Sequence, residues 1–230
     1  MKVSQPTVNR RVHVGPFDWN SGATDYWCVF TSDMLAAMGA TNMGVDGFSW
    51  VMTAISFTEA QTGDFLSSSD QTLTGAALNA SGDIISFNNI FGSYAHALVA
   101  AKILGYTPTR MIFEAYGAFS TASANETATF FGLCDNGQTD PTAAGSAACI
   151  YSNGTNFLLV SDNGSDTGAL IDTGVHVWKI AIDATNTEWF IDSVSQGTIA
   201  TETDIWPVCP KAIASTTNRL DFAWWHLWYE

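Results

Sequence analysis

Residues 174–193, GVHVWKIAIDATNTEWFIDS, contain two strand-like runs separated by a short polar segment. In the first run, residues 176–182, large apolar side chains recur at every second position, which is the period of a β-strand. Residues 183–186, DATN, are turn-forming, and residues 189–192, WFID, return as a second strand. The stretch therefore predicts an antiparallel hairpin of two aromatic-rich strands.

Other strand candidates follow the same pattern. In residues 110–119, RMIFEAYGAF, alternation places Met111, Phe113 and Ala115 on one face and the intervening residues on the other. Apolar runs bounded by turn residues predict further strands at residues 26–30, 48–57, 84–91, 127–133, 149–151 and 156–161. Helices are expected to be scarce, and the two candidates are residues 32–38 and 94–104, the second of which also fits a strand.

Residues 221–230, DFAWWHLWYE, are the last strand candidate. Strict alternation divides their side chains between a face with Phe222, Trp224, His226 and Trp228 and a face with Trp225, Leu227 and Tyr229. Both faces are apolar, so the simplest interpretation is a central strand that is covered on both sides. The alternatives are a sugar-binding platform or a partner interface on one face, because Trp and Tyr are frequent at binding surfaces.

The composition fits a single β-domain. The chain has 230 residues, of which 47% are hydrophobic and 13% charged, so it can bury a large core. Nine Trp and an aromatic share of 13% favour wide sheets with large side chains between them. No apolar run approaches the roughly 18 residues that a membrane-spanning helix needs, and we expect no membrane association.

Three regions resemble the concanavalin A-like and laminin G-like jelly rolls. Residues 178–193 are similar to the family's central hairpin through WKIAID and FID, with Ser193 in place of the usual glycine. Residues 110–135 are similar to its paired strands through FEA and FGLCD, and residues 220–228 lie where these folds end with an aromatic strand. The resemblance implies an all-β, two-sheet antiparallel jelly-roll sandwich. We expect a single domain over residues 25–230 after a short arm of residues 1–24, and the resemblance leaves the architecture of residues 25–105 open.

Charge is distributed unevenly along the chain. The net charge is −14, yet the first 17 residues contain Lys2, Arg10 and Arg11 and no acidic residue. The acidic remainder would repel phosphate backbones and anionic membranes, so nucleic acid is excluded as a partner. The basic arm is interpreted as a docking segment for an acidic partner surface, through Lys2, Arg10 and Arg11, or as a solvated terminal tail.

The cysteines do not form a metal-binding motif. Cys28, Cys134, Cys149 and Cys209 have no CxxC spacing and no nearby His, so neither a zinc site nor a cofactor is expected. All four are interpreted as buried free thiols, and the alternative is a cross-hairpin disulfide between Cys134 and Cys149, which flank a polar connection. The DNG segments at residues 135–140 and 162–166 are interpreted as turns rather than calcium loops.

Catalytic motifs are also missing from the sequence. It lacks the E-x-D-x-x-E strand of jelly-roll glycosidases and the G-x-S-x-G nucleophile elbow. Its four His residues have no motif partners, and a structural role is expected for His13, His96, His176 and His226. We therefore expect a protein that is not an enzyme.

Two functions fit these expectations. The first is a virion structural protein, such as a capsid decoration or head-fibre protein of a tailed phage. It would be made in the host cytoplasm, attached to capsid or other virion proteins through its arm, homo-oligomeric, and exposed on the virion surface with a host glycan as a further partner. The absence of a signal-peptide pattern in MKVSQPTVNRRVHVGPF favours it. The alternative is a carbohydrate-binding, lectin-like module or a degenerate glycoside hydrolase.

Overall fold

The computed structural model describes twelve ranges of the chain, which are residues 25–29, 43–45, 48–53, 56–58, 75–78, 84–88, 109–135, 138–143, 146–162, 164–202, 209–215 and 217–230. These ranges form strands and turns and contain no helix. In particular, no helix there is long and apolar enough to cross a membrane. The expected helices at residues 32–38 and 94–104, and the arm with Lys2, Arg10 and Arg11, lie outside the described residues.

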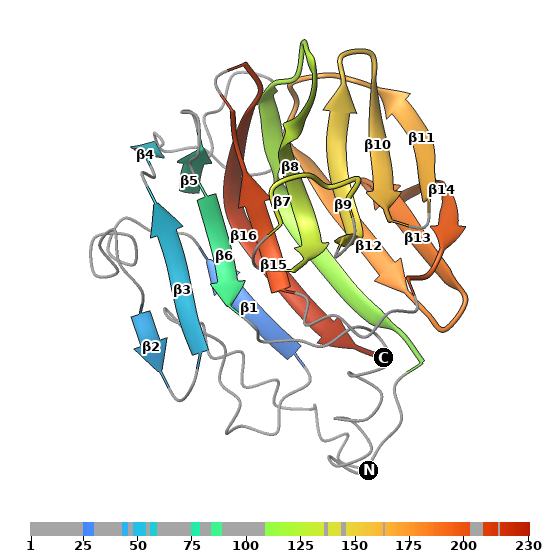
Figure 1. Cartoon of the computed structure of the whole chain (residues 1–230), viewed down its shortest axis with the longest axis horizontal. Helices are drawn as coiled ribbons and strands as arrows, with labels where there is room; N and C mark the ends of the chain where they lie inside the picture. Colours follow the sequence, from blue (N-terminus) through green and yellow to red (C-terminus); the bar gives the residue numbers. More distant parts are fainter. Residues whose placement is uncertain are drawn as a thin grey trace, which may run out of the picture.

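The strands of the described ranges form two antiparallel sheets of eight strands each (Figure 1). The β16 sheet has the order β14 (Val194–Ala200), β13 (Asn186–Ile191), β12 (His176–Ile182), β7 (Met111–Thr121), β16 (Arg219–Tyr229), β5 (Gly75–Leu78) and β4 (Ser56–Thr58), and β1 (Asp25–Val29) also pairs with β16. The β8 sheet has the order β11 (Gly164–Leu170), β10 (Asn156–Ser161), β9 (Ser146–Asn153), β8 (Asn125–Cys134), β15 (Cys209–Ile213), β6 (Ile84–Asn88), β3 (Phe48–Thr53) and β2 (Met43–Val45). The expected two-sheet β-sandwich is confirmed, and the described strands before residue 105 pair into both sheets.

Aromatic side chains fill the space between the sheets. Trp178 of β12 contacts Phe131 of β8 and Phe157 of β10 edge-on, with ring centroids 5.6 and 4.9 Å apart. Its indole N–H donates to the backbone oxygen of Gly117 over 2.9 Å, so the buried ring keeps its polar group satisfied. Replacing a buried ring of this kind by alanine costs about 3–5 kcal/mol, which makes Trp178 a main support of the core.

The hairpin predicted within residues 174–193 is present, and its turn lies where it was expected. β12 and β13 pair from Trp178 opposite Ile191 to Ile182 opposite Thr187. At the turn, the Asp183 carboxylate accepts the backbone N–H groups of Thr185 and Asn186, each over 2.7 Å. The side chain of Asp183 therefore builds the turn by taking up donors that the ladder leaves unpaired.

A second tight turn joins β13 to β14 at Asp192 and Ser193. Both residues have positive φ, 50° and 68°, and they connect the paired residues Ile191 and Val194. Two consecutive left-handed residues are the geometry of a type I′ hairpin turn. Ser193 thus occupies the position at which the jelly-roll resemblance has glycine.

A β-bulge in β16 changes the expected division of side chains between its faces. The register shifts between Phe222, opposite Gly117, and Trp224, opposite Tyr116. Phe222 consequently belongs to the core together with Trp225 and Leu227. The prediction that Phe222 shares a face with Trp224, His226 and Trp228 was wrong, because the bulge adds one residue to the alternation.

Cys134 and Cys149 are not joined to each other by a disulfide, and both are buried in a cluster with Phe130 and Val160. Burial raises the pKa of the Cys134 thiol well above its ordinary value, and the neighbouring Cys149 adds to the shift. The interpretation as buried thiols, rather than a Cys134–Cys149 disulfide, is confirmed for these two residues, and the side chains of Cys28 and Cys209 lie outside the described residues.

Candidate functional site

The β16 sheet carries half-buried aromatic and charged side chains on its outer face, the one directed away from the core. We call this set the outer face; it comprises Glu114, Tyr116, Lys179, Glu188, Phe190, Trp224, His226 and Trp228. They lie on four adjacent strands, β16, β7, β12 and β13. Partly exposed aromatic rings gathered on one sheet face are typical of a ligand or partner surface.

Two ring stacks involve β16. Trp224 stacks on Tyr116 of β7, with centroids 5.8 Å apart and planes 18° from parallel. His226 stacks on Trp228, with centroids 4.1 Å apart and planes 20° from parallel. Trp224 and Tyr116 pack against a small buried cluster of Ala118 and Ala223, which holds this stack in place. The result is a preformed aromatic platform.

Charged groups lie among these rings. The ammonium group of Lys179 is 5.2 Å from the ring centroid of Phe190 and 6.0 Å from that of Trp228. Glu114 is the register neighbour of both Lys179 and His226, and its Oε2 lies 4.0 Å from His226 Nδ1. The platform therefore offers hydrogen-bonding groups of both signs between aromatic surfaces.

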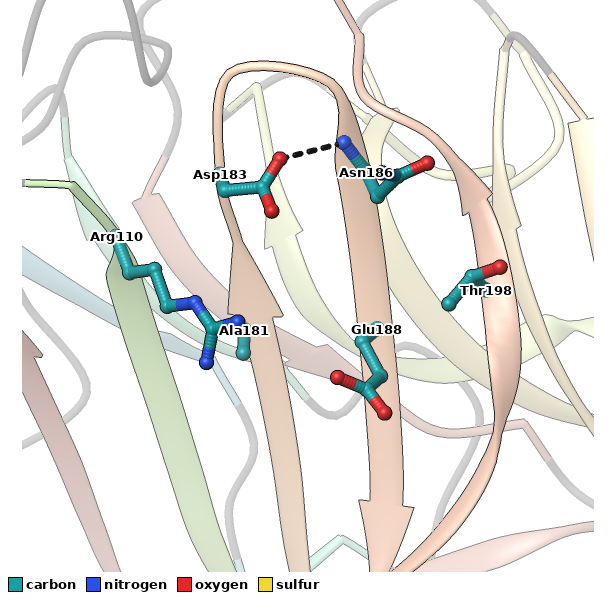
Figure 2. A pocket seen from close by; sticks show the side chains of 6 residues that line it. All are labelled: Arg110, Ala181, Asp183, Asn186, Glu188 and Thr198. Carbon is teal, nitrogen blue, oxygen red and sulfur yellow. Dashed lines mark hydrogen bonds between the residues drawn. The ribbon is translucent and has the colours of Figure 1, made fainter.

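A hollow of about 290 Å³ adjoins this platform (Figure 2). It is lined by Arg110, Ala181, Asp183, Asn186, Glu188 and Thr198. Ala181 of β12 pairs with Glu188 of β13, which pairs with Thr198 of β14. In the other direction this register row runs through Ile112 of β7 to Trp228. The hollow and the platform are thus neighbouring parts of one sheet face.

Hydrogen bonds position the two acidic side chains of the hollow, Asp183 and Glu188. The bonds from Asn186 and Thr185 to the Asp183 carboxylate keep the pKa of Asp183 below its ordinary value, with a smaller contribution from Arg110. Oε1 of Glu188 accepts the hydroxyl of Ser195 over 2.9 Å. Figure 2 shows Arg110 extending from the start of β7 toward Ala181, with Glu188 on the next strand. Within the described part of the chain, no hydrogen bond to the guanidinium group is present.

A separate cluster lies where β12 begins. Nδ1 of His176 is 2.6 Å from Asp192 Oδ2, and Nε2 is 2.8 Å from Asp172 Oδ1. Burial lowers the pKa of His176, but the two carboxylates outweigh it and the pKa is raised. Asp192 also accepts the backbone N–H of Val177 over 2.9 Å. Because both ring nitrogens are engaged, we interpret this cluster as a structural clasp.

The structure brings together residues that the sequence left isolated. His226 meets Glu114, and His176 meets two aspartates, although none of these pairs forms a sequence motif. Glu188 shares the hollow with Arg110 and Asp183. Among the described residues, no group of three or more His, Cys, Asp or Glu side chains is arranged to hold a metal ion.

The sequence matches no protein-family model and no curated protein. Solved structures with a similar fold include the Trypanosoma rangeli sialidase, with TM-score 0.50 and 10% identity over 88% of this chain and 30% of the sialidase. A protein of unknown function from Shewanella oneidensis MR-1 has TM-score 0.50 and 12% identity over 90% of this chain and 87% of that one. The binding domain of botulinum neurotoxin DC, solved in complex with SialylT, has TM-score 0.50 and 7% identity over 90% of this chain and 48% of that one.

These likenesses establish the β-sandwich fold. The chain spans less than half of the sialidase chain and of the toxin chain. The similar structures include both an enzyme and a binding domain, so the fold is compatible with either activity.

Proposed function

We propose that this protein binds carbohydrate on the outer face of the β16 sheet. The observation that carries the proposal is the platform formed by Trp224 stacked on Tyr116 and Trp228 stacked on His226, with Lys179 and Glu114 among the rings. Aromatic faces pack against the apolar faces of sugar rings, while charged side chains bind their hydroxyl groups.

The proposal is tested by calorimetric titration of neutral oligosaccharides into the whole chain. Trp224→Ala and Trp228→Ala are each expected to weaken binding about 5- to 150-fold, because a lost aromatic stacking surface is worth on the order of 1–3 kcal/mol. The matched control is Val194→Ala, since Val194 is an exposed apolar residue at 63% exposure on the edge strand β14. Unchanged binding in both Trp variants would refute the proposal.

Attachment to a virus particle remains a separate prediction. It depends on the basic arm with Lys2, Arg10 and Arg11, which lies outside the described residues, and it is compatible with glycan binding by the sandwich. Deleting residues 1–17 tests it: particle attachment should be lost while folding and glycan binding persist. Particles that retain the truncated chain would contradict the docking role of the arm. The homo-oligomer expected from the sequence is tested by light scattering of the same samples.

A further inference from the structure

We infer that the hollow at Arg110 and Glu188 is a subsite for a neutral sugar unit with adjacent hydroxyl groups, and that it discriminates against carboxylated sugars. This inference rests on the proposed carbohydrate binding and adds the class of sugar. It starts from the register row that runs across the sheet from Trp228 through Ile112 and Ala181 to Glu188. A chain of sugar units on the platform therefore has a direct continuation into the hollow.

The charges that line the hollow set the chemistry of its ligand. Arg110 contributes one positive charge, and Asp183 and Glu188 contribute two negative charges. A ligand carboxylate would bind the guanidinium group but would face two carboxylates, on a chain whose net charge is already −14. An acidic sugar is therefore disfavoured.

The hydrogen-bonding capacity of the lining leads to the same conclusion. An ionised carboxylate only accepts hydrogen bonds and a guanidinium group only donates them. A hydroxyl group does both, so two adjacent hydroxyls satisfy Glu188 and Arg110 at once. A ligand carboxylate would satisfy Arg110 alone, and a ligand ammonium group would satisfy the acids alone.

The size and rigidity of the hollow fit one sugar unit. Its volume of about 290 Å³ is at the lower limit of small-molecule pockets, which span about 300–1,000 Å³. The turn that binds the Asp183 carboxylate and the Ser195 hydroxyl that binds Glu188 hold both acids in place before a ligand arrives. Such preorganisation reduces the entropy lost on binding.

The test compares a neutral oligosaccharide with its uronic-acid counterpart of the same length and linkage, using calorimetry on the whole chain. The wild type is expected to bind the neutral sugar more tightly. Glu188→Gln keeps an oxygen acceptor but loses the charge, so it is expected to weaken that binding about fivefold and to narrow the difference between the affinities for the two sugars. Arg110→Ala should weaken binding of the neutral sugar as well, while Val194→Ala should not.

The outcomes separate this inference from the proposed function. If Glu188→Gln and Arg110→Ala leave binding unchanged while Trp224→Ala abolishes it, the platform binds sugar and the hollow does not, and the inference fails. A wild-type preference for the uronic acid also overturns it. Undiminished binding in Trp224→Ala and Trp228→Ala refutes the platform itself. Circular dichroism of each variant confirms that a lost affinity is not a lost fold.

Discussion

The indole N–H of Trp189 in β13 donates to Oδ2 of Asp166 in β11 over 2.9 Å and joins the two sheets at one edge. A second bond in the same seam runs from the backbone N–H of Ala169 to Oε1 of Gln196, also over 2.9 Å. The Trp189 side chain is fully buried, so its N–H depends on this partner. The edge of the sandwich is thus closed by side chains rather than by a backbone ladder.

Asp166→Ala should lower the free energy of unfolding by about 1–3 kcal/mol, because it leaves a buried donor unsatisfied. Asp166→Asn keeps an oxygen acceptor and should cost less. Urea denaturation of the three proteins measures the difference. Equal losses in both variants would show that the charge of Asp166, and not its bond to Trp189, matters.

Gly197→Ala should destabilise the same seam. A Cβ at Gly197 would lie 1.9 Å from Asp166 Oδ2, and the φ of Gly197 is +149°. We expect a loss of about 2 kcal/mol or more from the overlap and the backbone strain together. Gly164→Ala is the control, since Gly164 has φ +157° but nothing within 4 Å of its Cβ position. Thermal melting of both variants separates the backbone strain, which both share, from the overlap with Asp166, which only Gly197→Ala introduces. Equal melting temperatures would show that the overlap with Asp166 has no effect.

Ser193→Gly should stabilise the protein. Ser193 has φ 68° in the β13–β14 turn, a conformation that costs an L-residue about 1 kcal/mol and glycine almost nothing. The expected gain is about 0.5–1 kcal/mol, measured by chemical denaturation. Ser193→Ala, which keeps the Cβ, should show no gain. A loss of stability in Ser193→Gly would mean that the added freedom of the unfolded chain outweighs the relieved strain.

The His176 clasp should make stability depend on pH. The folded-state pKa of His176 is raised above 6.5, so the folded protein holds the proton more tightly than the unfolded chain does. Its contribution is fully present below pH 6.5 and is lost as the pH rises through the folded pKa. His176→Gln should remove this part of the pH dependence, as measured by denaturation at a series of pH values. If the free energy of unfolding of the wild type instead rises relative to that of His176→Gln as the pH increases above 6.5, the stabilising role of this cluster is wrong.

The parts of the fold that the sequence predicted are those with regular alternation. The run from His176 to Ile182 forms β12 with the expected bounds. Large apolar residues at every second position can be buried in only one strand register, because a shift by one residue would turn them to the other face. Strand alternation failed at Phe222, where the bulge is a property of the pairing with β7 and leaves no mark in the sequence of β16 itself. The seam between β11 and β14 was not predicted either, since it depends on how two hairpins meet in space.

The candidate site was only partly accessible from the sequence. The Trp residues of β16 indicated a possible sugar-binding platform, and Trp224 and Trp228 do lie on the aromatic platform of the outer face. The hollow was missed, because Arg110 and Glu188 lie far apart in the chain and carry no motif. The order of the strands in the sheet brings such residues together, and this order cannot be predicted from the residue pattern of any single strand.

The seam at Asp166 and Trp189 also bears on self-association. β11 and β14 are the last strands of their sheets, and edge strands are templates on which a second chain adds by backbone pairing. Here the amide of Ala169 is already occupied by Gln196, and Gly197 packs closely against Asp166. A foreign strand would have to displace these contacts before it could pair, so the seam protects this side of the sandwich against aggregation.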